Sequence, residues 1–312
     1  MNLMFTGGGG PGNEAIYRLW KDQYKLYFAD ADLLSINPSI PRAVCYEIPL
    51  ASNPIFFDEL LNLVKKMKID VLIPGVDEEL LFTKKLESVV SDMTVLSPDV
   101  SYIETMLDKF SMFQKLDKSS IDVPWTMIAD VTNNIAFPCI AKPRRGRGSR
   151  GFQVLYSYDH LEAYRKLSPF QPSDIILQER LVGQEYTVLM AADGNKNLHA
   201  VVPVRVDIKK GITIRAETEK SSVISNLCER IHRSYPTSGC YNIQLILTGE
   251  GRVVPFEINP RISTTFCLGL AAGIDPIEIF FRNSYNAGLE SFENEINLRR
   301  HWGNFISESK SD

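Results

Sequence analysis

In the stretch Val253–Ser263, which reads VVPFEINPRIS, polar side chains interrupt an apolar strand at regular intervals. Glu257, Asn259 and Arg261 occupy every second position. Successive side chains of a strand point to opposite faces, so these three lie on one face. Taken alone, they are typical of a solvated face. Pro255 favours a sheet edge or a bulge, because proline cannot donate a ladder hydrogen bond.

The segment before it, YNIQLIL at 241–247, predicts the partner strand of a β-hairpin. The turn between them, TGEG, is rich in glycine and even in length. We pair Leu247 with Arg252. In this register Gln244 lies on the same face as Glu257, as its diagonal neighbour.

Gln244, Glu257 and Asn259 therefore form one face that carries an acid and two amides. Oxygen ligands of this kind suit Mg²⁺ or Mn²⁺. Mg²⁺ takes one or two carboxylates and completes its coordination shell with water and substrate phosphates. The face predicts a metal site, and Arg261 lies where it could contact a transferred phosphate.

A second segment, PCIAKPRRGRGSRGFQVL at 138–155, places a basic loop after a strand that ends near Lys142. Five of the nine residues 142–150 are basic, in a chain of net charge −4. Glycines such as Gly148 let backbone N–H groups close around a phosphate, and Ser149 could donate another hydrogen bond. A solvated loop and an RNA contact are the alternatives. The RNA contact is disfavoured because no aromatic platform interleaves the arginines.

Between these two segments lies ILQERLVGQEYTVL, at 176–189. Glu179 ends an apolar strand, and Glu185 follows a turn. A strand edge near Leu181 can bind adenine through its backbone, and a carboxylate after the turn can accept two ribose hydroxyls. Considered singly, Glu179, Leu181 and Glu185 are ordinary turn residues.

The N-terminal part has a different sequence pattern. Short apolar runs alternate with helical patterns over residues 1–98, which predicts a parallel sheet with helices on both faces. From Asp108 onward, hairpins and helices predict an α+β arrangement. We place the boundary near residue 107.

Taken in order, LDKF, PCIAKP with its glycine loop, QERLVGQEY, NIQ and FEINPR resemble the ATP-grasp family. The resemblance is nearest to its carbamoyl-phosphate-synthase-like branch, which includes stand-alone carboxylate–amine ligases. Each motif is weak alone, but five in this order are specific. The resemblance implies the following fold: a Rossmann-like pre-ATP-grasp domain at 1–107, then a two-lobed ATP-grasp domain at 108–312, with a small nucleotide-binding lobe at 108–183 and a metal and substrate lobe at 184–312.

The same resemblance implies roles for single residues. Those that look like nucleotide contacts are the phosphate lysines Lys109 and Lys142, the adenine contacts Glu179 and Leu181, and the ribose carboxylate Glu185. Those that look like metal ligands are Gln244, Glu257 and Asn259, and Arg261 looks like the catalytic arginine that stabilises the phosphate. Many family members have an acid where Gln244 stands, which leaves the number of metal ions open.

The implied reaction uses ATP and Mg²⁺ or Mn²⁺ to join a small, amino-acid-like carboxylate to an amine through an acylphosphate, releasing ADP and phosphate. We expect Arg205 and Arg215 to bind a substrate carboxylate, although surface ion pairs are an equal alternative. The rival functions are a carboxylate or carbamate kinase that releases the acylphosphate, and a non-catalytic nucleotide-binding partner subunit. With one module, the chain is not expected to make carbamoyl phosphate alone.

The N-terminal glycines offer a further alternative. Gly7, Gly9 and Gly12 match GxGxxG, and Asp30 or Asp32 follows at the spacing of a dinucleotide fingerprint. We favour a substrate-side or structural role over NAD. The acidic run Asp77–Glu79 complements a helix N-terminus, and a contact with an amine is the lesser alternative.

Composition limits the remaining classes. The net charge of −4 gives no basic balance for nucleic acid or an anionic membrane. The five cysteines are scattered, which predicts reduced core thiols in a cytoplasmic protein. A homodimer is expected because relatives often pair.

Overall fold

The N-terminal sheet is parallel throughout, with the strand order β3-β2-β1-β4-β5. The computed structural model describes residues 1–130, 134–148, 150–282, 288–301 and 303. The strands of this sheet are β1 (Asn2–Thr6), β2 (Lys25–Asp30), β3 (Cys45–Glu47), β4 (Val71–Ile73) and β5 (Thr94–Val95). The helices that connect them are α1 (Asn13–Trp20), α2 (Phe56–Met67) and α3 (Leu80–Val89).

Helices cover both faces of this sheet. Leu3 and Phe5 pack with the helix α1, whereas Met4 lies in a second cluster with Phe56 and Leu60 of α2. Alternate residues of β1 thus face opposite helices, and Leu3, Met4 and Phe5 are fully buried. Parallel strands covered on both faces read as continuous apolar runs, which is why NLMF predicted this strand.

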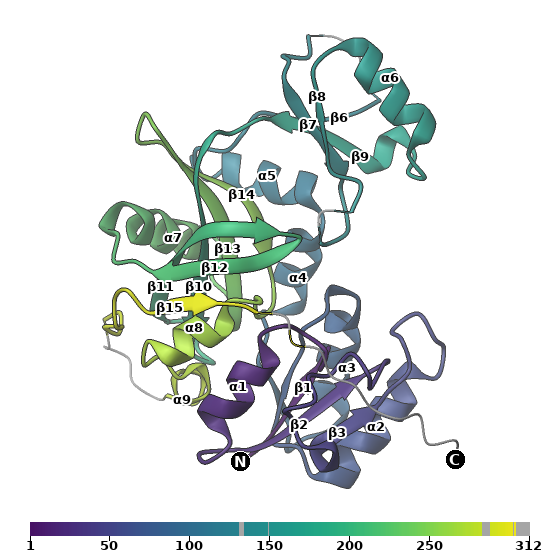
Figure 1. Ribbon diagram of the computed structural model, residues 1–312, viewed down its shortest axis with the longest axis vertical. Helices are drawn as coiled ribbons and strands as arrows, with labels where there is room; N and C mark the ends of the chain where they lie inside the picture. Colours follow the sequence, from purple (N-terminus) through teal and green to yellow (C-terminus); the bar gives the residue numbers. More distant parts are fainter. Residues whose placement is uncertain (131–133, 149, 283–287, 302, 304–312) are drawn as a thin grey trace.

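The four-stranded sheet is antiparallel, with the order β6-β9-β7-β8. Its strands are β6 (Thr126–Ile128), β7 (Cys139–Pro143), β8 (Gln153–Leu155) and β9 (Ile175–Glu179). Helix α6 (Tyr158–Leu167) packs on it and contributes Leu161 to a core of its own. This sheet stands apart from the N-terminal sheet, at the opposite end of the molecule (Figure 1).

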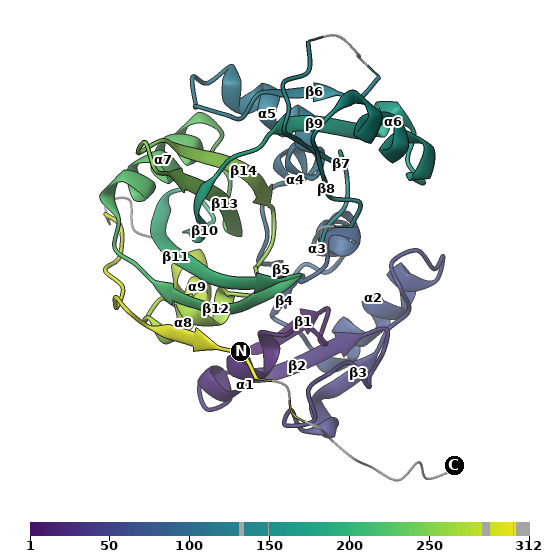
Figure 2. The same ribbon diagram turned by 45° about the horizontal axis from the view of Figure 1, so that its top comes forward.

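The six-stranded sheet lies between the other two (Figure 1) and has the order β14-β13-β10-β11-β12-β15. Its strands are β10 (Gly183–Ala192), β11 (Leu198–Lys210), β12 (Ile212–Thr218), β13 (Gly239–Thr248), β14 (Val253–Asn259) and β15 (Asn297–Arg299). The remaining helices are α4 (Val100–Leu107), α5 (Lys109–Asp117), α7 (Ser222–Ser234), α8 (Phe266–Ala271) and α9 (Pro276–Phe280). Figure 2 shows this sheet curving, so that β14 approaches the four-stranded sheet while β12 approaches the N-terminal sheet.

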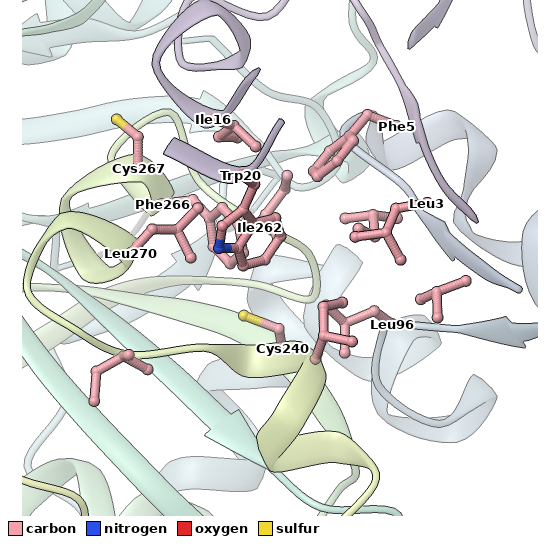
Figure 3. Close-up of a cluster of buried hydrophobic side chains, with 14 of the residues drawn as sticks. Leu3, Phe5, Ile16, Trp20, Leu96, Cys240, Ile262, Phe266, Cys267 and Leu270 are labelled. Carbon is pink, nitrogen blue, oxygen red and sulfur yellow. The ribbon is translucent and has the colours of Figure 1, made fainter. Parts of the chain in front are cut away.

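One hydrophobic cluster joins the N-terminal sheet to the six-stranded sheet (Figure 3). Trp20 of α1 packs edge-on against Phe266 of α8, with ring centroids 6.0 Å apart. Tyr102 and Met106 of α4 belong to another cluster, shared with α5, α7 and β13. The core is therefore continuous across residue 107, and the predicted boundary there stays a prediction about folding units.

The predicted architecture, a parallel α/β sheet followed by a two-lobed α+β part, is confirmed. Helix α4 and the short elements β6, α8, α9 and β15 were not predicted. Among the described residues, no helix is long and apolar enough to cross a membrane. All five cysteines are free thiols, and Cys45 is the one that is not buried.

The predicted hairpin register was wrong. Leu247 pairs with Val253 rather than Arg252, and a bulge at Phe256 then brings Gln244 directly opposite Glu257. Without the bulge, Gln244 would face Phe256, and Glu257 would lie on the other face of the sheet. The bulge therefore restores the predicted face by a different pairing. Pro255 lies on an edge strand beside this bulge, as its backbone requires.

Candidate functional site

Two adjoining cavities meet at the β13–β14 hairpin. The first, of about 450 Å³, lies between the four-stranded and six-stranded sheets. It is lined by seven of the residues predicted from the sequence: Lys109, Lys142, Glu179, Leu181, Glu185, Gln244 and Glu257. The structure thus brings together residues that are spread over almost 150 positions of the chain.

The second cavity, of about 790 Å³, lies between the hairpin and the N-terminal sheet. Gln244 and Glu257 line both cavities, whereas Asn259, Arg261 and Gly148 line only the second. The shared wall therefore includes two of the three predicted metal ligands, and each cavity receives a different part of the predicted site.

Three charged side chains converge at this wall. The Nζ atom of Lys109, at the start of α5, lies 3.2 Å from Glu257 Oε1. Lys142 of β7 donates a hydrogen bond of 3.2 Å to the backbone oxygen of Phe256. Burial lowers the pKa of Lys142 to about 8, although Glu257 opposes this shift. Burial likewise opposes the charge of Glu257, but Lys109 and Lys142 hold its pKa below the ordinary value.

The metal face is preorganised by amide contacts. Asn242 lies opposite Asn259 in the hairpin and accepts a hydrogen bond of 3.2 Å from its Nδ2. This contact uses the amino side of Asn259 and leaves its Oδ1 for another partner. With the glutamine and the ionised Glu257, the donor set fits Mg²⁺, which prefers oxygen ligands and completes its shell with phosphate and water.

Arg261 lies beside this face but is engaged elsewhere. Its guanidinium forms an ion pair with Asp77 of the N-terminal part and donates a hydrogen bond of 3.0 Å to the backbone oxygen of Ile262. The side chains of Arg261 and Asp77 are 14% and 13% exposed, so the pair is largely shielded from water. The guanidinium is thereby held at the second cavity.

The two carboxylates predicted to contact the nucleoside lie in the first cavity, and each has a cationic partner. Glu179 lies 3.1 Å from Arg252, and its other oxygen accepts a hydrogen bond of 3.4 Å from Trp125 N. Glu185 forms an ion pair with Lys209. Lys209 was not predicted, because the run DIKKG reads as a strand end followed by a turn. It lines both cavities.

The glycine loop after Lys142 contacts both α5 and the N-terminal part of the chain. The carbonyl of Gly146 accepts a hydrogen bond of 2.7 Å from Lys109 Nζ, and Arg147 lies 2.9 Å from Glu78 of the N-terminal part. Gly148 has φ +68°, with open space where a Cβ would lie. Ser149, also predicted to bind the nucleotide, lies outside the described residues.

Arg205 and Arg215, predicted to bind substrate, line neither cavity in the part of the chain that the structure describes. Arg205 lies 2.7 Å from Glu217 and 3.1 Å from Glu219, in the ion-pair arrangement that was the alternative. Arg215 is exposed on β12.

The N-terminal glycine turn lines the second cavity through Gly7, Gly9 and Gly10. Asp30 accepts a hydrogen bond of 2.8 Å from Gly9 N, so its carboxylate holds the turn itself. A Cβ on Gly12 would lie 2.9 Å from the carbonyl oxygen of Thr264. The turn is therefore packed against the segment that follows β14, on the side of the larger cavity.

Comparisons with known proteins relate the sequence and the fold of this chain to known families. Residues 171–301 match the family described as ATP-grasp in the biosynthetic pathway with Ter operon. The carbamoyl phosphate synthase large chain of Buchnera aphidicola is 23% identical over 91% of this chain. The match spans 29% of that protein's length.

Solved structures share the fold. An L-amino acid ligase from Bacillus licheniformis has a TM-score of 0.66 at 17% identity, and the match covers 88% of this chain and 71% of that one. The biotin carboxylase domain of 2-oxoglutarate carboxylase from Hydrogenobacter thermophilus, in complex with MgADP, has a TM-score of 0.70 at 14% identity. That match covers 95% of this chain and 73% of the other.

Residues 171–301 thus match an ATP-grasp family, and the chain shares its fold with solved ATP-grasp ligases. Within this class it is homologous to the carbamoyl phosphate synthase large chain, of which it spans about 29%.

Proposed function

We propose that this protein is an ATP-dependent ligase that joins a small, amino-acid-like carboxylate to an amine. The reaction would pass through an acylphosphate and release ADP and phosphate. The observation that carries the proposal is the convergence of Lys109, Lys142 and Glu257 from three separate elements on the wall between two cavities. The resemblance to ligases, including the L-amino acid ligase, supports the same reaction class.

In this proposal the first cavity holds the nucleotide. Lys109 and Lys142 bind phosphate oxygens, and the low pKa of Lys142 reflects a buried ammonium that gains most from an anionic partner. The carboxylates Glu179 and Glu185 face the nucleoside. Because phosphoryl transfer depends on positioning and charge neutralisation, fixed cations on this wall are the main contribution of the chain.

The residues Gln244, Glu257 and Asn259 would hold Mg²⁺ at the shared wall. When bound, Mg²⁺ supplies charge neutralisation on the phosphate oxygens. Arg261 faces the second cavity, where the substrates would lie, and stabilises the phosphate during transfer. Arg205 and Arg215 have no part in this proposal. A homodimer stays a prediction.

A screen for ADP release tests the proposal. Amino acids and small acids are offered singly and in pairs with ATP and Mg²⁺, and products are identified by mass spectrometry. The expected result is ADP and an amide only when an acid and an amine are both present. Acylphosphate formation without an amine would instead show a kinase. Nucleotide binding with no turnover of any pair would show a non-catalytic subunit.

A further inference from the structure

Glu79 is a buried carboxylate that the proposed reaction leaves unused. It ends the 3₁₀ helix Asp77–Glu79, which follows β4, and it is 7% exposed. Its Oε2 atom has no hydrogen-bond partner among the described residues, and the residue lines the second cavity. Since an unpaired buried carboxylate oxygen is costly, its place at a cavity wall favours a partner that donates hydrogen bonds.

Its position in the N-terminal sheet supports a binding role. The strand order β3-β2-β1-β4-β5 reverses between β1 and β4. In parallel sheets, ligands bind in the crevice at the carboxyl ends of the two strands where the order reverses. Glu79 follows β4, and the glycine turn that begins at Gly7 follows β1. Both line the second cavity, so the crevice opens toward the hairpin.

The charged groups around Glu79 determine whether a cationic or an anionic ligand is favoured there. The pKa of Glu79 is raised to about 7, mainly by burial; the neighbouring acids Asp30 and Glu78 act in the same direction, whereas the Thr6 hydroxyl and Arg147 oppose the shift. Arg147 already has Glu78 as a partner at 2.9 Å. The crevice thus has an excess of acid, which a cationic donor of hydrogen bonds would compensate.

The same cavity is also lined by basic side chains, namely Arg150, Lys209 and Arg261. Arg261 pairs with Asp77, which belongs to the same short helix as Glu79. A ligand that meets both Glu79 and these cations has an ammonium group and a carboxylate.

We propose that Glu79 binds the protonated amino group of a free amino acid substrate in the crevice between β1 and β4. This deepens the ligase function proposed above and rests on it. The carboxylate of the same amino acid then points toward Arg261 and the metal face. Glu79 is thereby the residue that distinguishes an amino acid from a simple carboxylic acid.

Calorimetric titration of the full chain tests this without catalysis. The probes are matched pairs of an α-amino acid and its des-amino acid, such as L-alanine with propionate and L-glutamate with glutarate, over the proteinogenic set. We expect at least one amino acid to bind about tenfold or more tightly than its des-amino partner. Glu79→Gln removes that preference and leaves the des-amino affinity unchanged. Glu59→Gln, an exposed acid on α2, serves as the matched control.

A pH series adds a readout that a structural role would not move. The amino acid stays protonated from pH 6 to pH 8, while Glu79 ionises. Its pKa of about 7 predicts that affinity rises about tenfold over this range in the wild type and stays flat in Glu79→Gln. Binding of an ATP analogue to the variant checks that the fold is intact.

Equal amino acid affinity in Glu79→Gln and wild type would overturn the inference, as would the absence of binding by every amino acid. Its failure is separable from that of the ligase function. If amino acids bind through Glu79 but no ADP is released, only the proposed ligase reaction is contradicted. If the protein is an active ligase and Glu79→Gln behaves like the wild type, only the proposed role of Glu79 is contradicted.

Discussion

Arg261 and Asp77 form an ion pair that joins the end of the β13–β14 hairpin to the N-terminal sheet, across 184 residues of sequence. The pair lies at the second cavity, next to Asn259 of the metal face. It orients the guanidinium, so in the proposed reaction little reorganisation would be needed when phosphate charge develops.

Arg261→Ala is expected to lower kcat about 100-fold or more, because the phosphate loses its guanidinium partner during transfer. The Kd of an ATP analogue stays nearly unchanged, since Arg261 does not line the first cavity. Steady-state kinetics and calorimetry measure the two quantities. Arg18→Ala removes an arginine that is 69% exposed on α1 and serves as the control. Turnover like that of the wild type would remove Arg261 from the mechanism.

Glu257→Gln is expected to weaken Mg²⁺-dependent nucleotide binding about tenfold or more, because the predicted metal face loses its one carboxylate. Calorimetry with Mg²⁺ and with EDTA separates metal-dependent from metal-independent binding. Glu250→Gln changes an exposed acid in the turn of the same hairpin and should have no effect. An equal loss of affinity in EDTA would show that Glu257 acts through its lysine partners alone.

Nucleotide affinity should fall as the pH rises above about 8, where free Lys142 loses its proton. Burial makes the ammonium easier to deprotonate, and only the ammonium attracts phosphate. Between pH 7 and pH 9 the Kd of ADP is expected to rise about tenfold. Lys142→Arg keeps the charge over this range, so its Kd should not follow the pH. A similar rise in Lys142→Arg would assign the titration to another group.

The stability of Glu79→Gln should exceed that of the wild type near pH 8. The carboxyl has a pKa of about 7 when folded and 4.5 ordinarily. Between these values the unfolded chain has released a proton that the folded chain retains, so wild-type stability falls as the pH rises. The difference between variant and wild type should grow by about 2–3 kcal/mol from pH 4.5 to pH 8. Urea unfolding at both pH values measures it, and a constant difference would contradict the assignment.

Gly12→Ala is expected to destabilise the fold by about 1–3 kcal/mol, because the added Cβ would lie 2.9 Å from the carbonyl oxygen of Thr264. Backbone on both sides leaves little room for relaxation. Gly194→Ala is the matched control, since its nearest neighbour to a Cβ is 3.8 Å away. Thermal unfolding compares them, and equal midpoints would show that the turn moves freely.

Most of the helices and strands could be predicted from local sequence patterns. Apolar runs located most of the strands, and periodic apolar residues such as Phe56, Leu60 and Val64 located α2. Helix α8 lacks such a pattern, because its residues are apolar on all sides and buried between α1 and the six-stranded sheet. The strand β15 pairs with β12 through only three residues, which is too short for a periodic signal.

The site was accessible from the sequence where one segment carries several of its residues. Glu257, Asn259 and Arg261 could be placed on one line from their spacing alone. The acidic run Asp77–Glu79 could be noted as a lesser candidate for an amine contact, but the sequence did not show which of its acids lines the cavity, and Lys209 was not predicted. Both depend on how separate sheets pack, and the spacing within their own segments does not contain this information. The bulge at Phe256 was not predicted, for a related reason. Pro255 indicates an irregularity in the strand, but it does not show which residue is the extra one.

That extra residue divides the hairpin into two parts with different tolerance to change in length. On the turn side, residues 249–252 can be lengthened or shortened without altering which way Glu257 points. Removing a single residue between Pro255 and Glu257 would instead turn the carboxylate away from Gln244. Homologues that diverge in this hairpin should therefore accumulate their insertions and deletions at the tip and keep a constant count near the wall.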